Sequence, residues 1–137
     1  MKTNAIILTF LGLLAPTVFS SPAEVDVAAS CGSLGVMNVN TSDLPAGVDP
    51  NNIRTCADHP VGSAHEVLEK RDCEYGAPVG CSGGYCWKQC GDEGSGQWCW
   101  TANNGGYGDW IKCSTSSQCN TNMACGIGDC SACGCSC

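Results

Sequence analysis

Basic side chains are scarce in this 137-residue chain, which holds six Lys and Arg residues against thirteen Asp and Glu residues. The region 72–137 contains two lysines and no arginine, together with six acidic residues. Nucleic-acid binding depends on several Lys or Arg contacts to phosphates, and attraction to anionic lipid depends on the same charges. The composition therefore argues against nucleic-acid binding and against lysis of membranes by a cationic peptide.

Histidine is missing from 72–137, because the chain's two histidines, His59 and His65, lie earlier. Without a base that titrates near neutral pH, this region has no Ser-His or Cys-His catalytic pair. Asp92 and Glu93 are adjacent carboxylates, but in a glycine-rich loop such a pair is more often solvated charge. We therefore expect that the protein is not an enzyme and that it uses no cofactor.

Long apolar runs are also rare, and the clearest one extends from Ala5 to Ala15, after Lys2. It is shorter than the roughly 20 residues that a membrane-spanning helix needs. Val18-Phe19-Ser20 follows it, with short side chains at the positions that a signal peptidase reads. The sequence therefore predicts a signal peptide at 1–20, cut after Ser20, and a secreted, extracellular protein that does not insert into membranes.

Cysteine, in contrast, is abundant, and its 14 residues fall into two even groups. Disulfides persist in extracellular proteins, and a small domain that buries little apolar surface needs them. Cys31 and Cys56 are expected to close one loop, and the other twelve to form six bridges whose pairing the spacing leaves open. These twelve are Cys73, Cys81, Cys86, Cys90, Cys99, Cys113, Cys119, Cys125, Cys130, Cys133, Cys135 and Cys137.

A dibasic pair, Lys70-Arg71, stands where the cysteine-poor part of the chain meets the cysteine-rich part. Its position at this change of composition favours proteolytic processing after Arg71 over an ordinary exposed pair of basic residues. The sequence then predicts a largely irregular propeptide or spacer at 21–71 and a monomeric mature domain at 72–137. Asn40-Thr41-Ser42 in the spacer is a sequon for N-glycosylation of Asn40.

Glycines are spread along the mature domain, which is predicted to be small, disulfide-rich and predominantly β. A hairpin is expected at 96–113, with its turn at Asn104-Gly105, because Asn-Gly between two strand-like runs is a strong hairpin signal. This turn places Trp98 opposite Ile111. Trp110 is then expected on the other face of the hairpin.

The spacing of the cysteines supports three further interpretations. Cys86 and Cys90 are four residues apart, which is one helical turn, so one short helix is predicted near 85–90. Together with Cys133 and Cys135, this spacing suggests a cysteine-stabilised α/β core. The crowded cysteines of the tail would also suit a soft metal such as Zn or Cu(I), but secretion favours disulfides over thiolate ligands.

All aromatic residues outside the signal region lie after Arg71. A flat row of aromatic side chains can bind a sugar polymer or a protein partner, and Trp and Tyr often anchor interfaces. Trp87, Trp98 and Trp100 therefore form the candidate binding surface. Trp98 and Trp110 are also expected to fill the core beside half-cystines, which leaves Trp87 and Trp100 as the better surface candidates.

Several blocks of this sequence are specific enough to compare with a known family. The blocks are Cys31-Gly-Ser-Leu-Gly-Val-Met, Cys56-Ala-Asp-His-Pro-Val-Gly, Tyr75 to Cys90, Gly96-Gln-Trp-Cys-Trp-Thr-Ala, Gly108-Asp-Trp-Ile-Lys-Cys and the terminal Cys-Gly-Cys-Ser-Cys. They resemble the small secreted cysteine-rich proteins of filamentous ascomycetes known as incompatibility-induced protein precursors. The resemblance covers most of 31–137 and implies a fungal effector that acts on a host or on competing organisms. It implies no catalytic residue and no ligand.

These observations together predict a secreted effector-like or antagonistic protein that binds an extracellular protein or polysaccharide of a host or competitor. One alternative is a carbohydrate- or chitin-binding module, which retention on insoluble chitin or cellulose would distinguish. The second alternative is a thiolate metal-binding protein, which a titration of free thiols would distinguish, because a fully bridged protein has none.

Overall fold

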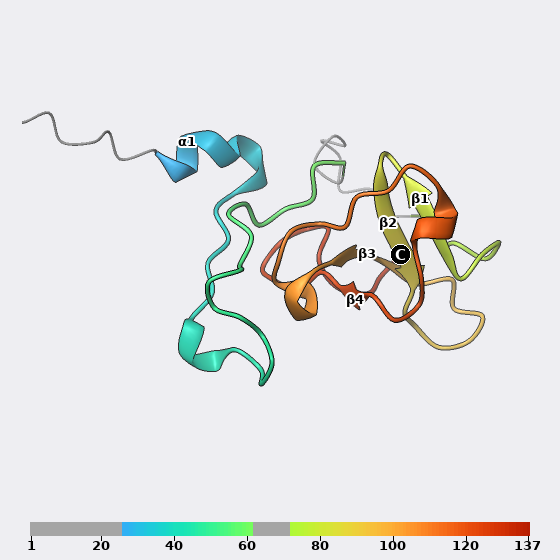
Figure 1. The fold of residues 1–137 in the computed structure, drawn as a ribbon. Coiled ribbons are helices and arrows are strands. Elements are labelled where there is room, and N and C mark those ends of the chain that lie inside the picture. The colour runs from blue at the N-terminus through green and yellow to red at the C-terminus, as the bar shows by residue number, and fades with distance from the viewer. Residues whose placement is uncertain (1–25, 62–71) are drawn as a thin grey trace, which may run out of the picture.

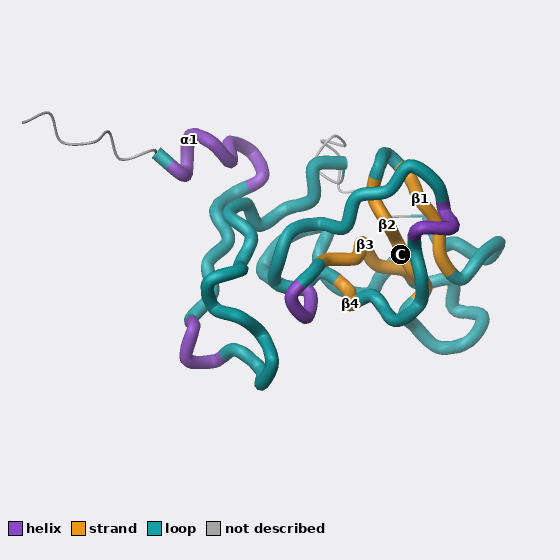
Figure 2. Tube along the Cα trace, viewed as in Figure 1, coloured by secondary structure: helices purple, strands orange, loops and turns teal. Residues whose placement is uncertain are grey.

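The computed structural model describes residues 26–61, here called the N-terminal segment, and residues 72–137, here called the cysteine-rich region. The predicted processing residues Ser20, Lys70 and Arg71 lie outside the described residues. Loops and turns surround a small antiparallel sheet with the strand order β1-β2-β3-β4 (Figure 2). The strands are β1 Val79–Ser82, β2 Tyr85–Gln89, β3 Trp98–Ala102 and β4 Ala124–Cys125 (Figure 1). The predicted small, disulfide-rich, predominantly β fold is confirmed.

The helical elements are short and lie outside the sheet. The α-helix α1, Val27–Cys31, belongs to the N-terminal segment, and the side chain of Asp26 caps it by accepting a hydrogen bond from the Ala29 backbone N–H at 3.2 Å. Such a cap supplies a partner for one of the N–H groups that the first turn leaves unpaired. The other helical elements within 26–61 and 72–137 are the 3₁₀ turns η1 Gly32–Leu34, η2 Thr41–Asp43, η4 Asn104–Gly106 and η5 Ser116–Gln118.

The short helix predicted near 85–90 is wrong, because these residues form strand β2. β1 and β2 are joined by the two-residue turn Gly83-Gly84, so that Ser82 pairs with Tyr85. Both glycines have positive φ, at 56° and 84°, as a tight hairpin turn of this length requires. The turn and the period-two alternation after it outweigh the four-residue spacing of the cysteines, which fits a strand as well as a helix.

The turn predicted at Asn104-Gly105 is confirmed. Asn104 and Gly105 have positive φ values of 50° and 65°, and the Gly106 N–H donates to the Asn103 carbonyl at 2.9 Å. Asparagine tolerates this left-handed conformation better than other residues with a side chain, and glycine adopts it without steric cost. The local signal in the sequence therefore located the turn correctly.

The strand register predicted around this turn is wrong by three residues. Ala102 pairs with Trp110, and the Ile111 N–H donates to the Thr101 carbonyl at 2.9 Å, so Trp98 does not face Ile111. The connection is longer than two residues, and the Gly108 N–H also donates to the Asn103 carbonyl at 2.9 Å. A slip by an odd number of residues exchanges the two faces of a strand. Trp110 therefore lies on the face of the sheet that carries Ala102.

All fourteen cysteines are bridged, and the two even groups close separately, as expected. Cys90 bonds to Cys135, but Cys86 bonds elsewhere, and no helix carries the two, so the predicted cysteine-stabilised α/β core is wrong. The bridges are Cys31–Cys56, Cys73–Cys137, Cys81–Cys113, Cys86–Cys119, Cys90–Cys135, Cys99–Cys125 and Cys130–Cys133.

The two faces of the sheet have different cores. Cys86, Cys99 and Thr101 point to one face and are almost completely buried, and the two cysteines bond to the loops that carry η5 and β4. Aromatic side chains cover the other face, where Trp100 and Trp110 are the large buried residues. Disulfides therefore hold one side together, whereas aromatic packing fills the other.

Candidate functional site

The three tryptophans of the predicted binding surface lie side by side on one face of the sheet. Trp87 of β2 pairs directly with Trp100 of β3, and Trp98 precedes Trp100 by two positions, so all three project from the same face. The ring centroids of Trp87 and Trp98 are 6.0 Å apart, and those of Trp98 and Trp100 are 5.1 Å apart. We call these three residues the aromatic row.

The aromatic row is partly exposed at one end and buried at the other. Trp87 and Trp98 are partly exposed, whereas Trp100 retains 5% of its accessible surface. Trp87 lies flat over Gly80, where any side chain would collide with the indole ring. The expectation that Trp100 is a surface residue is wrong, and the core position expected for Trp110 is confirmed, since Trp110 is 8% exposed.

Trp100 is buried because a histidine of the N-terminal segment stacks on it. The His59 ring lies 4.1 Å from the Trp100 ring, with an interplanar angle of 4°. Tyr85 and Trp110 meet the same imidazole edge-on at 4.5 and 4.8 Å. His59 has no accessible surface. It extends the aromatic row with a ring from another part of the chain, and sequence patterns alone indicate no such long-range contact.

Arg54 is a second buried side chain of the N-terminal segment, with 4% of its surface accessible. Its guanidinium carbon lies 4.2 Å from the Trp110 ring centroid, a cation–π contact. Its N–H groups reach both parts of the chain, donating to the carbonyls of Ala57 at 3.2 Å, Gly106 at 2.8 Å and Ile127 at 2.6 Å, and to the Cys133 Sγ at 3.3 Å.

The charge of Arg54 survives this burial at neutral pH. Desolvation by the surrounding protein lowers the pKa of Arg54 from its ordinary value to about 10, and the negative charges of Asp58 and Asp109 act in the opposite direction. The guanidinium therefore stays protonated. A buried cation of this kind is tolerated where carbonyl and carboxylate groups surround it.

Asp58 and Asn104 complete the contact between the two described parts. The Asp58 carboxylate accepts hydrogen bonds from the Ser131 hydroxyl at 2.7 Å and from the Ala132 N–H at 3.1 Å. The Asn104 side chain accepts from the Asp49 N–H at 2.8 Å, and it donates to the Asp49 and Asn52 carbonyls at 2.8 and 2.9 Å. The N-terminal segment, blue to green in Figure 1, is thus docked on the cysteine-rich region without a disulfide between them.

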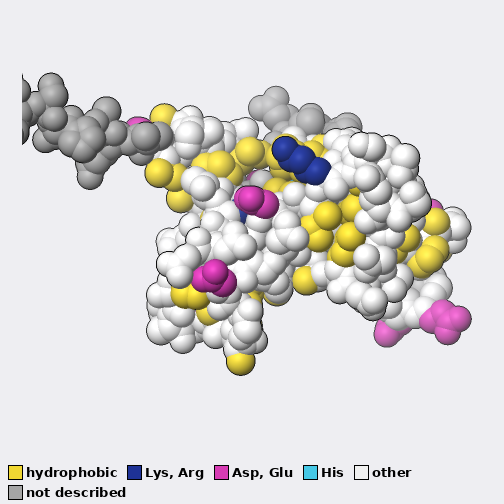
Figure 3. Space-filling view, viewed as in Figure 1, with side chains coloured by type: hydrophobic (Ala, Val, Ile, Leu, Met, Phe, Trp, Pro, Cys, Tyr) yellow, Lys and Arg dark blue, Asp and Glu magenta, His cyan; other side chains and the backbone are white. Residues whose placement is uncertain are grey.

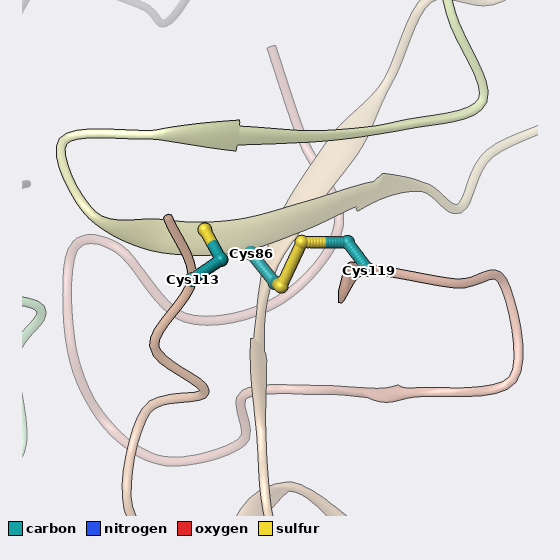
Figure 4. Close-up of side chains that lie close together, drawn as sticks. All are labelled: Cys86, Cys113 and Cys119. Atoms are coloured by element: carbon teal, nitrogen blue, oxygen red, sulfur yellow. A yellow bond between two sulfur atoms is a disulfide. The ribbon is translucent and has the colours of Figure 1, made fainter. Parts of the chain in front are cut away.

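Two groups of three cysteines bring their sulfur atoms within 4.8 Å of one another, and both belong to bridges. In Figure 4, Cys86 and Cys119 are joined, and the sulfur of Cys113 lies beside their disulfide. Thiolates, rather than disulfide sulfurs, are the ligands that soft metals take. Metal binding at this position would therefore require reduction of the bridges.

Charged side chains are dispersed over the surface of the molecule. Figure 3 shows scattered charged side chains among polar groups and patches of hydrophobic side chains. Asp92 and Glu93 are exposed, as solvated charges are expected to be. Asn40 is exposed before η2 and accepts a hydrogen bond from the Ser42 N–H at 3.2 Å.

Among the described residues, no helix has the length and apolarity needed to cross a membrane.

No protein-family model matches this chain, and comparisons with curated proteins and with solved structures find no match. The geometry therefore defines the class of molecule on its own. It is a small protein with seven disulfides, a four-stranded antiparallel sheet and a partly exposed aromatic row. Many disulfides are typical of proteins stabilised for an oxidising, extracellular environment.

Proposed function

We propose that this protein acts outside the cell as an effector-like or antagonistic binding protein, with Trp87 and Trp98 at the centre of its contact surface. The observation that carries the proposal is the aromatic row, of which two indole rings remain partly exposed on a disulfide-bridged sheet. The resemblance to secreted ascomycete proteins supports a host or a competing organism as the source of the target.

Trp87 and Trp98 combine a fixed position with a large apolar area. The Trp87 indole packs against the backbone of Gly80, which has no side chain to displace it. Trp98 donates a hydrogen bond from its indole N–H to the Asp72 carbonyl at 2.9 Å. Side chains held in this way lose little conformational entropy when a partner covers them. Tryptophan is also enriched among the residues that dominate binding energy at interfaces. Two adjacent indoles on one rigid face are therefore suited to anchor a partner.

Binding to whole cells tests the proposal without a known target. Fluorescently labelled protein is applied to intact plant and fungal cells, and retention is compared with that of Trp87→Ala and Trp98→Ala variants. Loss of a dominant interface residue costs about 2 kcal/mol or more, so retention should fall at least tenfold. Val36→Ala is the control, since Val36 is exposed and lies outside the aromatic row. Equal retention of all four proteins would contradict the assignment of this surface.

A carbohydrate-binding function is the second candidate, because flat, partly exposed indoles also suit sugar rings. Retention on insoluble chitin or cellulose that depends on Trp87 and Trp98 would favour it over a protein target. Protease treatment of the cells distinguishes the two further, since it removes protein targets and leaves polysaccharide. A thiolate metal-binding function requires free thiols, and the titration that tests it is expected to find none, because all fourteen cysteines are bridged.

A further inference from the structure

The loop that follows β4 contains a disulfide unlike the other six. Cys130 and Cys133 are bridged within the short sequence Cys-Ser-Ala-Cys, at a separation of three residues, whereas the other bridges span 25 to 64 residues. Both cysteines are partly exposed. In Cys-x-x-Cys pairs, the pKa of one thiol is commonly lowered, which makes the bridge easy to open and to close.

A cation touches one sulfur of this bridge. Nη2 of Arg54 donates to the Cys133 Sγ at 3.3 Å, and the same nitrogen donates to the Ile127 carbonyl at 2.6 Å, which fixes its position. A neighbouring guanidinium stabilises a thiolate more than a thiol. If the bridge opens, Cys133 is therefore the better leaving group, because its negative charge forms next to Arg54.

Other bridges hold the chain on both sides of this one. The bridges Cys99–Cys125 and Cys90–Cys135 hold the chain on either side of the loop. A disulfide restricts the unfolded chain least when the loop that it closes is shortest. Opening the Cys130–Cys133 bridge should therefore disturb stability less than opening any of the others.

The loop itself is held by Asp58. Its carboxylate accepts hydrogen bonds from the Ser131 hydroxyl and the Ala132 N–H, the two residues between the cysteines. These bonds keep the backbone in place when the sulfur atoms separate. The carboxylates of Asp58 and of Asp129, which precedes Cys130, oppose thiolate formation, so the contact with Arg54 decides which sulfur carries the charge.

We propose that Cys130–Cys133 is a thiol–disulfide exchange site that reacts with an external dithiol. A thiolate of the dithiol attacks the Cys130 Sγ. The bond between the two sulfurs breaks, and its electron pair passes to the Cys133 Sγ, which leaves as a thiolate beside Arg54. The first sulfur of the dithiol is now bonded to the Cys130 Sγ in a mixed disulfide. The second thiolate of the dithiol attacks that first sulfur, which closes a disulfide within the dithiol and releases the Cys130 thiolate. The dithiol is oxidised by two electrons, and the cysteine pair is reduced.

Stepwise reduction tests whether this bridge reacts first. The folded protein is titrated with dithiothreitol, free thiols are trapped with iodoacetamide, and the labelled cysteines are identified by mass spectrometry. Cys130 and Cys133 should be labelled at a reductant concentration at least tenfold below that needed for any other pair, with the circular dichroism spectrum unchanged. Earlier opening of another bridge, or simultaneous opening of all seven, would overturn the proposal.

Two single variants test the role of each sulfur. Cys130→Ser leaves Cys133 as a lone thiol, and Cys133→Ser leaves Cys130, so the pH dependence of alkylation reports each pKa. The pKa of the Cys133 thiol should be at least one unit lower than that of the Cys130 thiol. Arg54→Met should abolish the difference, and Arg54→Lys, which keeps the charge, should retain part of it. Equal values in the two cysteine variants would refute the assignment even if the Arg54 variants fail to fold.

Discussion

Replacing His59 with alanine should weaken the association of the N-terminal segment with the cysteine-rich region about 100-fold. No disulfide joins the two parts, so cleavage at Lys70-Arg71 converts their packing into a measurable binding reaction. Lys70-Arg71 is the one Lys-Arg pair in the sequence, and a protease specific for such pairs cuts there alone.

The magnitude follows from the three rings that contact the imidazole. His59 has no accessible surface and meets Trp100, Tyr85 and Trp110 at centroid distances of 4.1, 4.5 and 4.8 Å. Aromatic pairs contribute about 0.5–1.5 kcal/mol each beyond the area that they bury. Three such pairs amount to about 3 kcal/mol, and each 1.4 kcal/mol changes an equilibrium constant about tenfold.

The assay uses the cleaved protein with its disulfides intact. The two pieces are separated in denaturant, returned to buffer, and mixed at increasing concentration while tryptophan fluorescence reports the covering of Trp100. His59→Ala is compared with the unchanged protein and with Val36→Ala, a substitution in the same segment at a side chain that is 44% exposed. The control should alter Kd less than threefold.

Two results would contradict the expected role of His59 in docking. If His59→Ala changes Kd less than threefold, the ring contacts contribute little to docking. If the unchanged pieces separate at micromolar concentration, then Arg54, Asp58 and His59 together do not hold the segment in place. In that case, processing after Arg71 would uncover Trp100 and enlarge the aromatic surface offered to a partner.

Three further substitutions probe the same packing. Arg54→Met should lower the free energy of unfolding by about 3 kcal/mol in a urea titration, because buried carbonyls lose their donor, and an unchanged midpoint would contradict this. Gly126→Ala should lower the free energy of unfolding by about 1–3 kcal/mol in the same titration, since its new methyl group would collide with the Trp110 ring. An unchanged free energy of unfolding would show that the ring can move. Asn104→Ala should weaken association of the cleaved pieces about tenfold through three lost hydrogen bonds, and Kd within twofold of the unchanged protein would count against it.

Local signals in the sequence were sufficient for part of the fold. The turn at Asn104-Gly105 was predicted correctly because positive φ at two consecutive positions restricts the residues that fit. Gly83-Gly84 is a comparable turn signal, and it indicates the β1–β2 hairpin that the structure contains. The four-residue interval between Cys86 and Cys90, on which the predicted helix was based, does not distinguish a helix from a strand.

The candidate site was only partly predictable. Alternation along a strand puts Trp98 and Trp100 on one face, so their proximity follows from sequence. The burial of Trp100 does not, because His59 reaches it from another part of the chain. The contact of Arg54 with Cys133, across 79 residues, is of the same kind.

The amino-acid sequence alone predicts the even division of the cysteines, the β character of the cysteine-rich region and the position of one turn. These properties depend on composition and on the backbone preferences of neighbouring residues. The folded chain is needed to show which cysteines pair, which tryptophans stay exposed and where the N-terminal segment docks. Those outcomes depend on the packing of residues far apart in the chain, and many different packings satisfy the same local preferences.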